Sequence, residues 1–188
     1  MAIRSLLKTI TAVTTLCLSL NASAALIFNY EEDNTNISEI NTTVGAITLT
    51  VDAHQAVPGP NLEGDVTRNT NGLGVFMNLQ DSSLVEDDEY LRFTLSETFY
   101  GYLTIVFAEW ENNDSARIGI KDQANQTYSA NTNTFTTYLN GSNRFTVKSR
   151  NANTEFFVQQ VELVPEPTSL AILSLGLLGL GMRRFRKS

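Results

Sequence analysis

Hydrophobic and polar residues alternate in short runs along the middle of the chain. The pattern is clearest over residues 91–95, 117–121 and 144–148, where Leu, Ile, Phe or Val stands at every second position between polar or charged neighbours. Successive side chains of a strand point to opposite faces, so this period of two predicts strands that bury one face. The middle of the chain shows no comparable helical period, and we expect no helix there.

Further segments rich in Thr, Val, Ile and Phe extend the pattern, and turn-forming residues such as Pro58-Gly59-Pro60 separate them. About nine short strands at this spacing predict an all-β fold, an antiparallel β-sandwich of the jelly-roll or immunoglobulin-like kind. The additional predicted strands are 26–30, 44–51, 74–79, 102–110, 134–139 and 156–163.

Two glycine-containing segments predict local features of the fold. Asn140-Gly141 separates the predicted strands 134–139 and 144–148, which favours a hairpin between them. Gly72-Leu73-Gly74 opens a strand rather than a helix, so it predicts a tight strand entry and not a phosphate-binding loop.

The N-terminal segment, residues 1–24, has a different character. Arg4 and Lys8 precede an apolar run over 10–20, and Ala22-Ser23-Ala24 follows it. The run is shorter than the roughly 20 residues that span a bilayer, and small residues at this spacing are typical of a secretory signal peptide. The single cysteine, Cys17, would leave with this peptide, so the exported domain depends on a packed core and not on disulfides.

The C-terminal segment, residues 165–188, has three ordered parts. Pro165-Glu166-Pro167 comes first, and a Leu- and Gly-rich apolar run over 168–182 follows. The run predicts a short hydrophobic transmembrane helix, stopped at the inner membrane face by a basic cluster. The cluster consists of Arg183, Arg184, Arg186 and Lys187.

These three parts resemble, in the same order, the PEP-CTERM sorting signal of Gram-negative bacteria. The resemblance implies that an integral-membrane exosortase recognises Pro165, Glu166 and Pro167 and cleaves near them. The chain would then be anchored transiently in the inner membrane and released to the surface or matrix of a host that makes exopolysaccharide. A plain C-terminal anchor without processing is the alternative.

Removing the two ends changes the charge of the protein. The predicted domain, residues 25–164, holds 7 Lys and Arg against 19 Asp and Glu, hence a formal net charge of −12. Nucleic acid is excluded as a partner, because phosphate binding needs a Lys and Arg footprint. An acidic domain suits divalent cations, neutral sugars or cationic partners.

Several enzyme classes are excluded by composition. His54 is the only histidine, so two-histidine zinc sites and H-E-x-x-H proteases are ruled out, and no G-x-S-x-G motif is present. Asp52 lies two positions before His54, but no nucleophile is indicated. We interpret His54 as a loop histidine.

Two glutamates close the predicted strand 102–110. Strict alternation would place Glu109 and Glu111 on one face and Trp110 on the other, the face that also carries Tyr102. Paired carboxylates are what a glycosidase needs. A solvated strand end and a metal or ligand site on the following loop are the other interpretations, and the face of Tyr102 and Trp110 is either a sugar platform or a second core layer.

A second acidic run, Asp81, Glu86, Asp87 and Asp88, supplies the oxygen ligands that calcium prefers. A solvated loop is the alternative, since a charge run is usually a hydrated surface.

Together these observations predict an exported, non-enzymatic surface or matrix protein, with exopolysaccharide or calcium as its expected ligand. The alternative is a small secreted carbohydrate-active enzyme that uses Glu109 or Glu111. A self-assembling subunit is the third hypothesis.

Overall fold

The structure is a computed structural model, which describes residues 25–30, 35–56, 61–77, 84–86, 88–129, 132–150 and 154–166. The predicted signal peptide and the predicted C-terminal helix lie outside the described residues. Residues Ala25–Val164 form one compact unit. Within the described ranges, no helix has the length and apolar character needed to span a bilayer.

The described residues form thirteen β-strands that pair antiparallel, which confirms the all-β antiparallel prediction. The strands are β1 (Leu26–Asn29), β2 (Thr35–Ile37), β3 (Glu39–Val44), β4 (Ile47–Gln55), β5 (Leu62–Asn69), β6 (Gly72–Phe76), β7 (Glu89–Phe99), β8 (Gly101–Ala108), β9 (Ala116–Ile120), β10 (Gln126–Tyr128), β11 (Thr134–Tyr138), β12 (Ser142–Ser149) and β13 (Phe157–Pro165).

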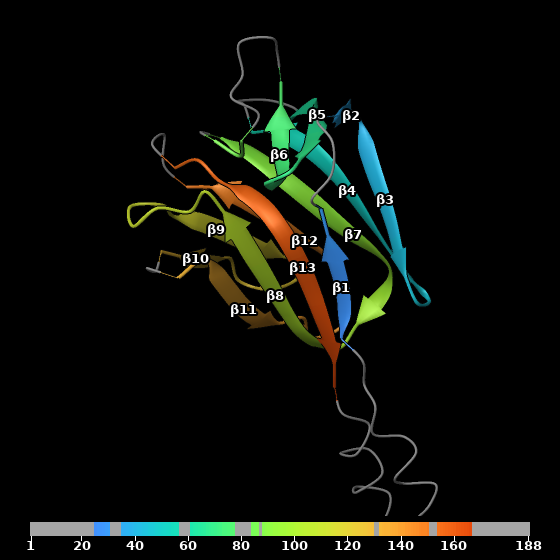
Figure 1. The fold of residues 1–188 in the computed structure, drawn as a ribbon. Helices are drawn as coiled ribbons and strands as arrows, with labels where there is room; N and C mark the ends of the chain where they lie inside the picture. Colours follow the sequence, from blue (N-terminus) through green and yellow to red (C-terminus); the bar gives the residue numbers. More distant parts are fainter. Residues whose placement is uncertain are drawn as a thin grey trace, which may run out of the picture. The chain divides into compact units, whose positions relative to one another are not determined.

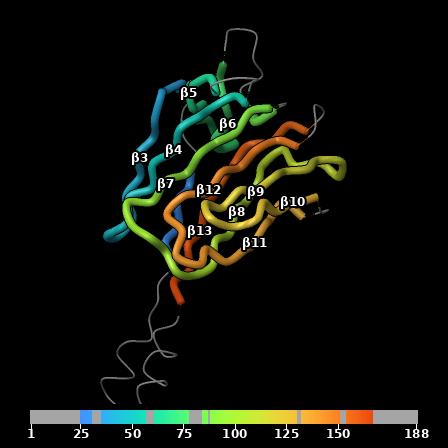
Figure 2. The backbone as a smooth tube through the Cα atoms, turned by 180° about the vertical axis from the view of Figure 1, so that it is seen from behind, coloured from blue at the N-terminus to red at the C-terminus, as the bar shows by residue number. Residues whose placement is uncertain are grey.

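The strands follow one hydrogen-bonded path that folds over on itself. Its order is β10-β9-β12-β7-β4-β5-β6-β13-β8-β11, with β3 beside β4, β1 beside β13 and β2 beside β5. The bend lies in β5, where Leu62–Gly64 pair with β4 and 65–69 pair with β6. We call β10, β9, β12, β7, β4 and β3 the first layer, and the strands from β6 to β11 with β1 and β2 the second layer. Figure 1 looks onto β13, β8 and β1 of the second layer, and Figure 2 shows β4, β7, β12 and β9 of the first layer from behind.

A hydrophobic core lies between the two layers. Leu91, Phe93 and Leu95 of β7 are at most 2% exposed, which agrees with the predicted alternation. The Phe93 ring stacks on the ring of Phe145 in β12, with centroids 4.7 Å apart. Each fully buried side chain of this size contributes about 1.5–3 kcal/mol. Because the core and the strand pairings lie inside 25–164, this unit holds what it needs to fold alone.

The observed strands differ in part from the predicted ones. The predicted strand 44–51 is interrupted by a two-residue turn at Gly45-Ala46, where Gly45 adopts a φ of 62° and Val44 pairs with Ile47. β5 escaped prediction because its sequence, LEGDVTRN, is mostly polar and only Val66 and Thr67 are buried.

The predicted hairpin at Asn140-Gly141 is wrong. β11 pairs with β8, whereas β12 pairs with β7 and β9, so residues 139–142 carry the chain from one layer to the other. This connection lies beside the connection between β7 and β8, and two hydrogen bonds join them. The Gly141 N–H donates to the Phe99 carbonyl at 3.0 Å, and the Leu139 N–H donates to the Gly101 carbonyl at 2.9 Å. A turn signal predicts a local bend but not the layer that receives the next strand.

Gly72 opens β6 at a point where two backbones come close, which agrees with the predicted strand entry. Its φ is 134°, and a Cβ there would lie 2.5 Å from the Val158 carbonyl oxygen of β13. At Gly45 the φ is also positive, but a Cβ would meet only the Leu26 side chain at 3.7 Å. Gly45 therefore needs glycine for its backbone conformation alone, and Gly72 for conformation and space together.

These two glycines form a matched pair for a stability test. We expect Gly45→Ala to cost about 1 kcal/mol, the usual strain of a left-handed alanine. Gly72→Ala should cost about 3 kcal/mol or more, because the backbone of β13 must also move. Urea denaturation of residues 25–164 measures both losses, and equal losses would show that β6 and β13 do not approach as closely as described.

Candidate functional site

The outward face of the first layer carries cross-strand rows of polar side chains. In one row, Arg117 of β9 lies opposite Lys148 of β12, Lys148 opposite Tyr90 of β7, and Tyr90 opposite His54 of β4. The next row places Gly119, Thr146, Arg92 and Asp52 in the same strand order. We call these two rows the polar face. Directly opposite residues of paired strands interact, so each row brings together segments that are far apart in the sequence.

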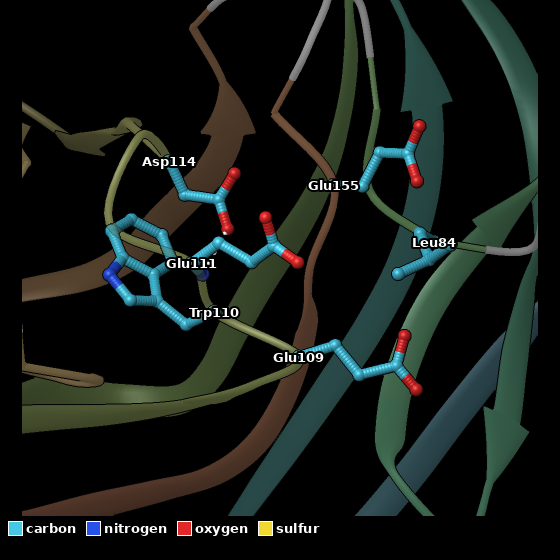
Figure 3. Close-up of a pocket in the computed structure, with 6 residues that line it drawn as sticks. All are labelled: Leu84, Glu109, Trp110, Glu111, Asp114 and Glu155. Carbon is cyan, nitrogen blue, oxygen red and sulfur yellow. Dashed lines mark hydrogen bonds between the residues drawn. The ribbon is translucent and has the colours of Figure 1, made fainter.

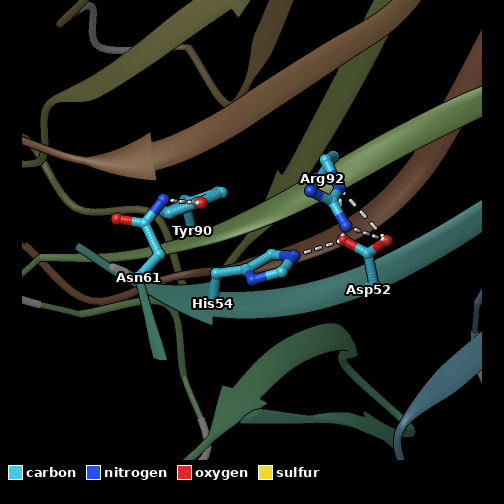
Figure 4. Close-up of polar contacts among 5 residues, drawn as sticks. All are labelled: Asp52, His54, Asn61, Tyr90 and Arg92. Carbon is cyan, nitrogen blue, oxygen red and sulfur yellow. Dashed lines mark hydrogen bonds and ion pairs between the residues drawn. The ribbon is translucent and has the colours of Figure 1, made fainter. Parts of the chain in front are cut away.

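Asp52 is the centre of a polar network on this face (Figure 4). His54 Nε2 lies 2.7 Å from Asp52 Oδ1. The Arg92 guanidinium binds both carboxylate oxygens, with Nε 2.8 Å from Oδ1 and Nη2 2.9 Å from Oδ2. The hydrogen bond to Asp52 raises the pKa of Arg92 above its usual value. Because the carboxylate is shared by two donors, this network neutralises a charge and positions two strands.

The interpretation of His54 as a loop histidine is wrong. It lies within β4, and its side chain is buried, with 7% exposure. Its ring stacks on Tyr90, with centroids 5.1 Å apart and planes at 20°. The Tyr90 hydroxyl in turn accepts a hydrogen bond of 2.7 Å from the Asn61 side-chain amide. Tyr90 is thus held on one side by a ring and at its tip by an amide.

A hollow of about 260 Å³ lies beside Tyr90 on the polar face. Gly119 helps to keep it open, because a Cβ there would lie 2.7 Å from the Thr146 hydroxyl oxygen and 3.0 Å from Asn125 Oδ1. The side chains that line the hollow offer cations, amides, a hydroxyl and a phenol ring. They are Asn61, Tyr90, Arg117, Asn125, Thr146 and Lys148.

A larger cleft of about 620 Å³ lies where β8 ends (Figure 3). Its lining is dominated by carboxylates, together with Trp110 and Leu84. Both predicted glutamates lie here, so the structure brings Glu109 and Glu111 to one cleft. The other two carboxylates belong to Asp114, which lies on the loop that the sequence offered as a metal or ligand site, and to Glu155, which the sequence did not single out.

The predicted alternation fails at the end of β8. The strand stops at Ala108, and Glu109 adopts a φ of 57°, which breaks the period of two. Trp110 consequently packs toward the core, stacked on Phe107 with centroids 4.7 Å apart. Tyr102 stays on the outer face, 53% exposed. Tyr102 and Trp110 therefore form neither a common sugar platform nor a second core layer.

Asp114 is the buried member of the acidic cleft, with 5% exposure. Its carboxylate accepts a hydrogen bond of 2.6 Å from the Glu111 backbone N–H. Burial raises the pKa of Asp114 above its usual value, although backbone N–H groups oppose the shift. Among the residues described, no group of three or more His, Cys, Asp or Glu side chains is arranged to hold a metal ion.

The predicted calcium ligands are only partly covered by the structure. Asp81 and Asp87 lie outside the described residues. Asp88 pairs with Lys148 at 2.8 Å, and the Glu86 N–H donates to the buried Glu89 carboxylate at 3.2 Å. The calcium site stays a prediction.

The residues of the predicted sorting signal are also only partly covered by the structure. Pro165 ends β13 and Glu166 follows it. Pro167 and the basic stop, Arg183, Arg184, Arg186 and Lys187, lie outside the described residues.

Sequence reasoning missed the polar face as a site. Four of its residues occupy the polar phase of the predicted strands 91–95, 117–121 and 144–148, so their outward direction could have been read from the alternation; they are Arg92, Arg117, Thr146 and Lys148. Asp52 and His54 lie outside every predicted strand, and Tyr90 lies just before one. The pairing of those strands could not be predicted from the alternation, because it depends on contacts between distant segments.

No curated protein matches the chain. Among solved structures, the chain is similar to "CBM35 from Cellvibrio japonicus Abf62", with 17% sequence identity and a TM-score of 0.35, over 75% of this chain and 93% of that one. At that TM-score the likeness carries no argument about function.

The tail gives a specific result. Residues 163–187 match the family described as the PEP-CTERM protein-sorting motif. This match spans Pro165-Glu166-Pro167, the apolar run and the basic cluster, and it confirms the resemblance found in the sequence. The C-terminal tail of this chain carries a PEP-CTERM protein-sorting motif.

Proposed function

We propose that this chain is an exported protein that an exosortase sorts through its C-terminal tail to the cell surface or the extracellular matrix. The match of residues 163–187 to the PEP-CTERM motif is the observation that carries this proposal. The predicted signal peptide supplies entry to the export route. The apolar run and basic stop provide transient anchoring in the inner membrane before release.

The domain, in this proposal, binds exopolysaccharide and catalyses no reaction. Sugar rings present apolar faces edged by hydroxyls, and a site for them combines aromatic rings with a few placed polar groups. The hollow beside Tyr90 has these parts, namely the amides of Asn61 and Asn125 and the hydroxyl of Thr146. These side chains come from strands or from links next to them, which keeps the arrangement rigid.

The acidic cleft supports the alternative, a small secreted carbohydrate-active enzyme. It holds Glu109 and Glu111 beside Trp110, and two carboxylates flanking a sugar are the usual glycosidase arrangement. Against it, catalytic carboxylates are normally locked by packed neighbours, whereas both glutamates are exposed and follow the end of β8. We therefore favour binding over catalysis.

Two finer predictions accompany this proposal. Calcium would bind to the hard oxygen ligands of Asp81, Glu86, Asp87 and Asp88, in the segment before β7. The jelly-roll or immunoglobulin-like assignment of the two layers would place ligands on strand faces or end loops.

Processing by an exosortase has a measurable product. Mass spectrometry of protein from the native host should find a C-terminus between Val164 and Pro167. Cleavage before Leu163 is not expected, because Leu163 is fully buried and pairs with Leu26 of β1. A variant with Ala in place of Pro165, Glu166 and Pro167 should end at Ser188, and a wild-type chain ending at Ser188 would contradict processing.

Binding to exopolysaccharide should stabilise the domain against heat. Residues 25–164 with the host's own exopolysaccharide should melt several degrees higher, because a ligand at about 100 times its Kd adds about 2.7 kcal/mol. The same measurement with calcium alone tests the loop ligands. An unchanged Tm together with no cosedimentation would contradict polysaccharide binding.

The two glutamates separate binding from catalysis. We expect wild-type protein to release no reducing ends from the host's exopolysaccharide, and Glu109→Gln and Glu111→Gln to leave its binding unchanged. The carboxylate-to-amide change preserves shape, and it removes the negative charge together with the acid–base and nucleophilic chemistry. Release of reducing ends that either substitution abolishes would establish the enzyme instead.

A further inference from the structure

Positive charge gathers on one face of an acidic domain. Residues 25–164 contain 7 Lys and Arg and carry a formal net charge of −12 from 19 Asp and Glu. Four of the seven cations stand at outward positions of neighbouring strands in the first layer. They are Arg92, Arg117, Arg144 and Lys148.

These four cations differ in how far they are neutralised. Arg92 is bound by Asp52 on both carboxylate oxygens. Lys148 pairs with Asp88, whose side chain is 70% exposed, and such surface pairs contribute at most about 1 kcal/mol. Arg117 and Arg144 are exposed and make no ion pair within the part of the chain that the structure describes.

Two of these cations, Arg117 and Lys148, line the hollow beside Tyr90, and they lie directly opposite each other on β9 and β12. The Arg117 guanidinium can bind both oxygens of a carboxylate, and Lys148 can exchange its exposed partner for a second contact. Arg144 lies outside the lining. The hollow is therefore the one place on this face where cations, a ring and amides converge among the described residues.

The size of the hollow limits what enters it. Its volume of about 260 Å³ is below the roughly 300–1,000 Å³ of pockets that enclose drug-sized ligands. It can hold one ring of a chain that continues across the surface. A nucleic acid backbone is disfavoured, because its row of phosphates needs a wider footprint of Lys and Arg than the two cations that line the hollow.

We propose that this hollow binds one carboxylated sugar residue, a hexuronate, of an acidic polysaccharide. The sugar carboxylate lies between Arg117 and Lys148, its ring contacts Tyr90, and its hydroxyls bond to Asn125 and Thr146. This inference rests on the proposed polysaccharide binding and names the chemical class of the sugar. It differs from the expectation, drawn from net charge alone, of divalent cations, neutral sugars or cationic partners.

Titration calorimetry of residues 25–164 tests this assignment with a matched pair of ligands, trigalacturonate and its methyl ester. The ester keeps the ring and hydroxyls but removes the charge, so we expect it to bind at least tenfold more weakly. Raising the salt concentration should weaken binding of the acid and leave binding of the ester nearly unchanged. Equal affinity for acid and ester would overturn the proposal.

Two arginine variants test whether the ligand binds in the hollow. Arg117→Gln should weaken trigalacturonate binding at least tenfold, whereas Arg144→Gln, with the same change of charge on the same face, should weaken it less than threefold. Both side chains are exposed, so thermal unfolding should show both variants folded. Equal losses would indicate diffuse attraction to the whole face and overturn the assignment to the hollow.

Two further outcomes separate this inference from the proposed function. If the host's exopolysaccharide binds but trigalacturonate does not, the uronate assignment fails while polysaccharide binding stands. If neither binds, both fail. Tighter binding of a DNA duplex than of trigalacturonate, lost in Arg117→Gln, would assign the hollow to phosphate instead.

Discussion

The whole domain depends on one shared core between two layers of strands, because no disulfide is available to hold it. The only cysteine of the chain is Cys17, in the predicted signal peptide. Phe93 and Phe145 stack within the first layer, and Leu103, Ile105 and Phe107 of β8 are fully buried in the second. β5 belongs to both layers, so the hydrogen-bonded path does not break where the sheet folds over. Burial and backbone pairing together do the work that disulfides do in many smaller exported domains.

The same core determines what the outer surface displays. Every residue that β7, β9 and β12 turn inward requires its neighbours to turn outward, and strand register aligns those neighbours in rows. The row from Arg117 to His54 is therefore a consequence of core packing as much as of surface chemistry. Its contents still differ from a simple solvated face, since His54 is buried and stacked on Tyr90.

Charge is distributed in two contrasting sites. The acidic cleft at the end of β8 collects four carboxylates around Trp110, and the hollow on the polar face collects Arg117 and Lys148. The net charge of the domain combines these two sites and therefore does not describe the local charge of either one. The hollow is the surface on which the proposed anionic glycan would bind, while the remaining surface stays strongly negative, which favours solubility.

The sequence by itself determined the features that are local. The period of two identified the strands with strong alternation, and the ordered parts of the tail identified the sorting motif, because both patterns lie within a few consecutive residues. It also located Glu109 and Glu111 at the end of a strand, although not the direction of Trp110. The left-handed backbone conformation of Glu109 breaks the alternation, and this conformation could not be predicted from the residue type.

Only the tertiary structure decided which strands pair. Asn140-Gly141 makes a turn, but its two strands enter different layers, because each finds its partners among segments far away in the chain. The same nonlocal pairing brings Tyr90, Arg117 and Lys148 to one hollow and buries His54 in β4. Alternation predicts which face of a strand a side chain lies on. Its neighbours on that face depend on which strands pair, and the pairing is set by the free energy of the whole core rather than by any short stretch of sequence.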